Sequence, residues 1–127
     1  MTILGIDPGR DKSGVAVIDG EGRERFLKTV PTEKLAKYTK ALVERYNVQK
    51  IALGNGTTSK AALEVLAEFQ DKIQLVDEYN TTQEAKKEFL RRNPPKGLLG
   101  LLPEGMVPVN RPVDNLVALI LAKKLQE

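Results

Sequence analysis

Three carboxylates stand at positions from which they could act together. Asp7 directly follows a short apolar segment, Glu78 follows another, and Asp114 falls in the first turn of the last predicted helix. The chain contains no His and no Cys, which excludes a Ser-His relay, thiolate catalysis and zinc sites built on those residues. A site made only of carboxylates favours hard cations. We therefore predict that Asp7, Glu78 and Asp114 hold Mg²⁺ or Mn²⁺ and are catalytic.

Each carboxylate also has a simpler interpretation. An Asp before Pro8-Gly9 commonly initiates a turn, and a Glu at a strand end is usually a solvated charge. Asp114 would favour a helix N-terminus by about 0.3–1 kcal/mol through the helix dipole. The functional interpretation depends on the convergence of all three side chains.

Basic and polar residues accompany these carboxylates. Arg10 and Lys12 lie close to Asp7 in the sequence, and the glycine-rich loop 54–60 joins a predicted strand to a helix. Backbone N–H groups of such a loop can bind phosphate, although the Gly-Lys-Ser/Thr ending of a nucleotide-binding loop is missing. Local charge balance and a tight turn capped by Ser59 are the alternatives. The predicted nucleic-acid-binding residues are Arg10, Lys12, Asn55, Lys60 and Arg111.

The elements that must position these residues follow from hydrophobic periodicity and turn signals. Strands are predicted over 2–6, 14–19, 23–30, 50–53 and 73–76, and helices over 32–46, 59–69 and 81–92, with a last helix starting at Pro112. Thr81 and Glu84 have the spacing of a capping box. Short turns make the first three strands an antiparallel meander, and the later strand–helix alternation requires parallel strands. The predicted fold class is α/β, with a mixed five-stranded sheet flanked by helices. Its strand ends would bring Asp7 and Glu78 to one edge.

Composition sets the wider expectations. The 127 residues suit one domain covering 1–127, and 41% hydrophobic with 29% charged residues is typical of a soluble protein. The net charge of +3 favours an anionic partner. No apolar run reaches membrane length and no export signal is evident, so we expect a cytoplasmic protein without a membrane partner. Segment 93–110 is rich in Leu; we expect it to cover the core as a short helix, with a homodimer contact as the alternative.

Motifs along the chain resemble those of the YqgF/RuvX-like family, whose members are assigned as Holliday junction resolvases or pre-16S rRNA nucleases within the RNase H-like superfamily. The matching stretches are 3–9 with 14–17, then 53–56, 76–78 with 81–85, and Asp114 with 116–121. The resemblance implies an RNase H-like fold with the family's acidic triad on Asp7, Glu78 and Asp114. It further implies hydrolysis of phosphodiester bonds in branched DNA or an rRNA precursor, with two metal ions ~4 Å apart.

Three features distinguish this chain within that resemblance. RuvC resolvases carry a Glu where this chain has Gly54-Asn55, and paired acids in the last helix where this chain has Arg111 before Asp114. Tyr79 stands where nuclease-type YqgF members usually carry a basic residue. The Gly-Asn-Gly-Thr loop 54–57 resembles that of the YqgF-type domain in Tex-like transcription accessory proteins. That last feature implies the alternative function, a non-catalytic nucleic-acid-binding module.

Overall fold

The structure is a computed structural model that describes residues 1–102 and 113–126, and each strand begins and ends within two residues of its predicted bounds. Two helices are shorter than predicted, because residues 32–34 and 67–69 form 3-10 helices instead. The strands are β1 (Ile3–Asp7), β2 (Lys12–Ile18), β3 (Glu24–Pro31), β4 (Lys50–Gly54) and β5 (Ile73–Val76). The helices are α1 (Leu35–Tyr46), α2 (Ser59–Val65), α3 (Thr81–Arg92) and α4 (Asp114–Gln126). Short 3-10 helices span Thr32–Lys34, Ala67–Phe69 and Gly97–Leu101.

In the described part of the chain, the strands form one five-stranded sheet in the order β3-β2-β1-β4-β5. Strand β2 pairs with β1 and with β3 in antiparallel fashion, whereas β4 pairs with β1 and with β5 in parallel. The predicted meander and the predicted parallel portion are both confirmed. Strand β1 lies at the centre, so its last residue, Asp7, has a neighbouring strand on each side.

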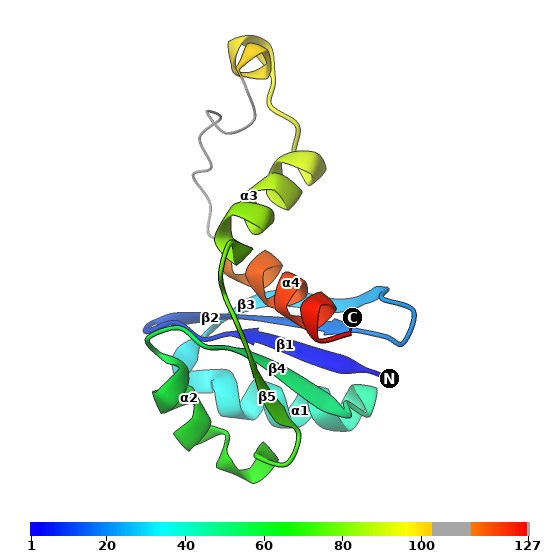
Figure 1. The fold of residues 1–127 in the computed structure, drawn as a ribbon, viewed down its shortest axis with the longest axis vertical. Helices are drawn as coiled ribbons and strands as arrows, with labels where there is room; N and C mark the ends of the chain where they lie inside the picture. Colours follow the sequence, from blue (N-terminus) through cyan, green and yellow to red (C-terminus); the bar gives the residue numbers. More distant parts are fainter. Residues whose placement is uncertain (103–112, 127) are drawn as a thin grey trace.

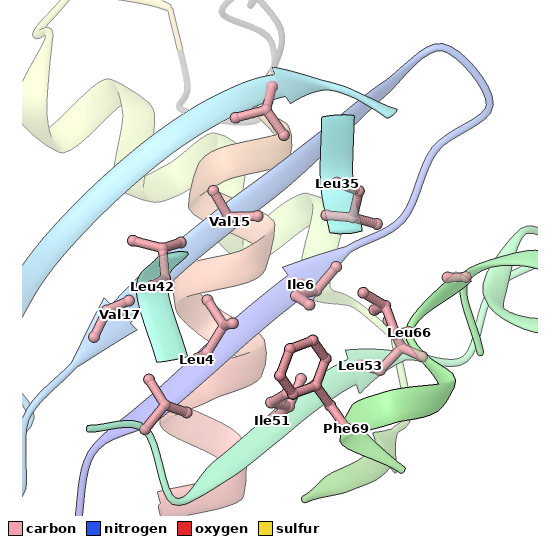
Figure 2. Close-up of a cluster of buried hydrophobic side chains, with 13 residues drawn as sticks. Leu4, Ile6, Val15, Val17, Leu35, Leu42, Ile51, Leu53, Leu66 and Phe69 are labelled. Carbon is pink, nitrogen blue, oxygen red and sulfur yellow. The ribbon is translucent and has the colours of Figure 1, made fainter. Parts of the chain in front are cut away.

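Alternate residues of the central strands form a large core on one face of the sheet. Leu4 and Ile6 of β1 point to this face, because successive side chains of a strand point to opposite sides. Figure 2 shows them packed with side chains from β2, β4 and the two helices α1 and α2 that cover this face. The labelled members are Leu4, Ile6, Val15, Val17, Leu35, Leu42, Ile51, Leu53, Leu66 and Phe69.

Helix α4 covers the opposite face, where β1 and β2 each carry a glycine directly beneath the helix. A Cβ atom added at Gly5 would overlap the backbone carbonyl of Ala118, and one added at Gly14 would overlap that of Asp114. The helix backbone therefore lies directly against the sheet, which only glycine permits at these two positions. Figure 1 shows α4 on the side of the sheet away from α1 and α2, and α3 extending beyond it.

The 3-10 helix Gly97–Leu101 lies away from the sheet (Figure 1). Leu101 is 82% exposed and Leu102 is 39% exposed, so the prediction that this segment covers the core is wrong for these two residues. Helices α1, α2 and α4 already fill both faces of the sheet. Met106 lies outside the described residues, and the homodimer contact stays a prediction. Within 1–102 and 113–126, no helix has the length and hydropathy needed to cross a bilayer.

Candidate carboxylate site at the sheet edge

Asp7 is the half-buried last residue of β1, and its place in the sheet defines the centre of the site. It lies two residues beyond Gly5, so its side chain points to the face covered by α4. Its cross-strand partner on β2 is Gly14, and the adjacent strand on the other side is β4, where Ile6 pairs with Leu53. The two neighbouring positions on the same face as Asp7 are therefore glycines, Gly14 and Gly54.

Asp114 reaches this region from the β2 side. A Cβ atom at Gly14 would overlap the carbonyl oxygen of Asp114 and approach the amide nitrogen of Asn115 to 2.7 Å. The first residue of α4 thus lies directly over the cross-strand partner of Asp7. The structure therefore brings the backbone of Asp114 next to Gly14, the cross-strand partner of Asp7.

Glu78 reaches Asp7 from the β4 side. A Cβ atom at Gly54 would overlap the Glu78 carboxylate, and one at Gly56 would approach its Oε2 to 2.6 Å. The two glycines therefore form a cradle for this carboxylate beside Asp7. In the described residues, the buried Oε1 of Glu78 has no hydrogen-bond partner, which is costly for a buried carboxylate oxygen.

The backbone of Glu78 is fixed on both sides. Its N–H donates to Oδ1 of Asn55 (3.2 Å), and its carbonyl accepts from both the Oγ1 (2.6 Å) and the backbone N–H (3.0 Å) of Thr81. The predicted capping box is wrong, because Thr81 is the first helical residue and Asn80 precedes it in the left-handed conformation (φ 63°) without a side-chain cap. The Thr81 hydroxyl instead positions the loop that carries Glu78.

The electrostatics of the site show uncompensated negative charge. The pKa of Asp7 is raised from 3.8 to about 7, first by burial and then by the charges of Glu78 and Asp114. Burial also raises the pKa of Asp114, while the charge of Lys12 opposes this shift. Carboxylates that disfavour one another's ionisation in this way are typical of functional sites.

The predicted nucleic-acid-binding residues are mostly found around this site. Arg10, Lys12, Asn55 and Lys60 are exposed, and Arg111 lies outside the described residues. The Thr58 hydroxyl donates to the carbonyl of Pro8 (2.5 Å), which ties the glycine loop to the turn after Asp7. No side chain caps α2, so the predicted Ser59 cap is absent in this described segment.

The same turn is fixed from its other side. The Ser13 hydroxyl accepts from the Gly9 N–H (3.3 Å), and the Thr32 hydroxyl donates to the Gly9 carbonyl (2.8 Å). The side chains of Ser13 and Thr32 also hydrogen-bond to one another (2.8 Å). Arg10 therefore lies in a well-anchored turn after Asp7, and Lys12 begins β2 directly after that turn.

The donor set fits a hard divalent cation. The three carboxylates supply only oxygen, the buried Oε1 of Glu78 has no partner among the described residues, and a cation would relieve the repulsion that raises the Asp7 pKa. As oriented here, no three His, Cys, Asp or Glu side chains within 1–102 and 113–126 are grouped closely enough to hold one ion together. Binding would therefore require a carboxylate to reorient.

Sequence reasoning did not identify the roles of Gly54, Gly56 and Thr58. The sequence left the glycine loop open as either a phosphate contact or a tight turn, and its described contacts are to Glu78 and Pro8. The sequence feature that could have identified the cradle is the position of Gly54 at the end of a strand next to the strand that carries Asp7. Interpreting this feature requires the pairing register of the strands, which the sequence alone does not provide.

A central β1 flanked by antiparallel β2 and parallel β4, with Asp7 at the end of β1 and Glu78 after β5, is the arrangement of an RNase H-like fold. Two solved structures share the fold. Thermus thermophilus RuvC has a TM-score of 0.61 at 15% identity, over 98% of this chain and 96% of that one. T. thermophilus RuvC in complex with a Holliday junction substrate has a TM-score of 0.59 at 16% identity, over 96% and 90%. At these identities the likeness shows the fold alone.

The chain belongs to the family described as the Tex protein YqgF-like domain, whose model matches residues 1–89. The matched stretch contains Asp7 and Glu78, and Asp114 lies beyond it. No curated protein matches the sequence. The predicted YqgF-type family and RNase H-like fold are both confirmed.

Proposed function

We propose that this protein is a divalent-metal-dependent endonuclease that hydrolyses phosphodiester bonds in structured nucleic acid, either branched DNA or an rRNA precursor, with residues 1–127 working as one domain. The observation that carries the proposal is the placement of Glu78. Its carboxylate occupies the Gly54–Gly56 cradle, has a buried oxygen without a partner in the described residues, and raises the pKa of Asp7.

Asp7, Glu78 and Asp114 are the residues that would hold Mg²⁺ or Mn²⁺. When bound, such ions activate water and stabilise the leaving oxygen. Asp7, with its pKa raised to about 7, would have to lose its proton before it could hold a cation, so cation binding would be coupled to proton release. Asn55 and Thr81 keep the Glu78 backbone in place.

The basic residues have a separate task in this proposal. Arg10, Lys12 and Lys60 are exposed and lie in or directly after the two loops that the Thr58–Pro8 hydrogen bond joins, Lys12 at the start of β2 and Lys60 in the first turn of α2. Contacts from such side chains to phosphates on either side of the cleaved bond would hold a polyanion over a negatively charged site. This arrangement predicts binding that weakens as the salt concentration rises.

A second function is favoured by the family match itself. The matching model is that of the Tex protein's YqgF-like domain, and the resemblance of loop 54–57 to the loop of that domain supports a nucleic-acid-binding module without turnover. Such a module would bind with the same dependence on salt. It would not require the carboxylates to be ionised or to hold a cation.

Cleavage of a four-way DNA junction and of an rRNA-precursor hairpin, in Mg²⁺ and in Mn²⁺, separates the two functions. We expect Asp7→Asn and Glu78→Gln to lose about 10²-fold or more of the activity. Asp77→Asn is the matched control, because Asp77 is the exposed neighbour of Glu78 and its Oδ1 only accepts from the Tyr79 N–H. Full activity in Asp7→Asn would exclude the nuclease proposal. Salt-dependent binding without any cleavage by the unaltered protein would favour the binding module.

A further inference from the structure

Tyr79 differs from the other five aromatic residues of the chain in the solvent exposure of its ring. The sequence has three Tyr, three Phe and no Trp, and all six lie within the described residues. Phe69 is buried, and four others pack against the two cores: Phe26, Tyr38, Tyr46 and Phe89. Tyr79 is 75% exposed. An aromatic ring held in water loses the burial that normally stabilises it, so this ring needs another explanation.

The backbone of Tyr79 is fixed although its ring is exposed. Its N–H donates to Oδ1 of Asp77 (2.9 Å), and its carbonyl accepts from Nζ of Lys124 on α4 (3.1 Å). The next residue, Asn80, takes the left-handed conformation. The ring is therefore presented from an ordered turn, and it makes neither of these two bonds.

The position of that turn links the ring to the carboxylate site. Tyr79 directly follows Glu78, so their Cα atoms are only ~3.8 Å apart. The length of a Tyr side chain is comparable to the distance from a phosphate to its base. A nucleic acid whose phosphate lies at the carboxylates would therefore bring a neighbouring base within reach of the ring.

We propose that Tyr79 stacks on an unpaired base beside the phosphodiester held at the carboxylate site. This inference rests on the proposed function and narrows its substrate. Bases within a continuous duplex have both faces covered by their neighbours, so a protein ring reaches a free face only at a loop, a bulge, an end or a flipped base. The substrate would then be structured nucleic acid with an unstacked base at the cut. One ring supplies one stacking contact rather than a track for single strands.

A double-mutant cycle between the ring and the base tests this proposal. Binding is measured by fluorescence anisotropy on an Asp7→Asn background, so that cleavage does not consume the probe. The probes are a DNA hairpin with an unpaired loop, the same hairpin with abasic loop nucleotides, and a blunt duplex whose ends are sealed. The variants are Tyr79→Ala, Tyr79→Phe and, as control, Val65→Ala, an exposed apolar residue on α2.

We expect Tyr79→Ala to weaken hairpin binding about 5- to 150-fold, the usual effect of removing one stacked ring, while Tyr79→Phe stays within roughly twofold. The abasic hairpin should bind both Tyr79 and Tyr79→Ala proteins equally weakly. Binding of the sealed duplex should not depend on residue 79, and Val65→Ala should leave every affinity unchanged.

Two results would overturn the proposal and can be told apart. If Tyr79→Ala binds the hairpin as tightly as the Tyr79 protein, or loses as much affinity for the abasic probe, stacking is wrong while the nuclease proposal stands on its own cleavage assay. If the Tyr79 protein binds none of the three probes, the proposed nucleic-acid function fails and the stacking proposal fails with it.

Discussion

Replacing Asp7 with Asn should stabilise the metal-free protein. The raised pKa of Asp7, about 7 instead of 3.8, means that the folded state resists its ionisation. The ionised Asp7 therefore destabilises the folded protein. This destabilisation is absent below pH ~4, grows as the pH rises and is complete above pH ~7, with a ceiling of ~4 kcal/mol. Because Asp7 is only half-buried, solvent screening reduces this destabilisation. We expect the free energy of unfolding of Asp7→Asn to exceed that of the unaltered protein by about 2 kcal/mol at pH 8.

Urea denaturation in EDTA at several pH values gives the free energy of unfolding of both proteins. The gain is the difference between the two values, in which the contributions of the other titrating groups cancel. Saturating Mg²⁺ should then raise the stability of the unaltered protein, by ~2.7 kcal/mol at 100 times the dissociation constant, and leave Asp7→Asn unchanged. A gain that is equal at pH 4 and pH 8, or a loss of stability at pH 8, would refute the electrostatic reasoning.

Three further substitutions test the geometry of the site. Gly54→Ala should destabilise the protein by about 1–3 kcal/mol, because the added methyl group overlaps the Glu78 carboxylate. Calorimetric unfolding should show that this cost disappears when Glu78 is also replaced by Ala. A cost that persists in the double variant would contradict the Gly54–Gly56 cradle. Gly14→Ala should cost about as much or more, because the added Cβ meets the backbone of α4, and near-normal stability in urea would mean that the helix does not lie on this glycine. Asn55→Ala should weaken Mg²⁺ binding about 10-fold, because it removes the acceptor that holds the Glu78 N–H. Asn55→Asp keeps an acceptor oxygen and should lose less Mg²⁺ affinity when both variants are measured by isothermal titration. Equal losses of affinity in the two variants would contradict the positioning role.

Much of the fold could be predicted from the sequence because its signals are local. The turn residues Pro8-Gly9 mark the end of β1, and short apolar runs bounded by turn residues mark the strands beside it. The order of strands and helices then restricts the topology through the handedness of the connections. Local patterns together with these rules of topology therefore predict that Asp7 and Glu78 lie at one edge of the sheet.

The contacts that shape the site could not be predicted in this way. The Glu78 carboxylate lies on Gly54 and Gly56, and the backbone N–H of Glu78 donates to Oδ1 of Asn55. All three partners are more than 20 positions away along the chain. Such pairs depend on the parallel register of β4 with β5, which no local pattern encodes. The capping-box prediction at Thr81 failed for a related reason, because its hydroxyl bonds the Glu78 carbonyl instead of capping the helix.

The measurement that tests the central claim most directly is anomalous X-ray scattering from crystals of this protein soaked with Mn²⁺. The account predicts Mn²⁺ bound jointly by Asp7, Glu78 and Asp114, with Oε1 of Glu78 as a ligand and its carboxylate still in the Gly54–Gly56 cradle. Saturating Mn²⁺ that leaves these three carboxylates without metal would contradict it.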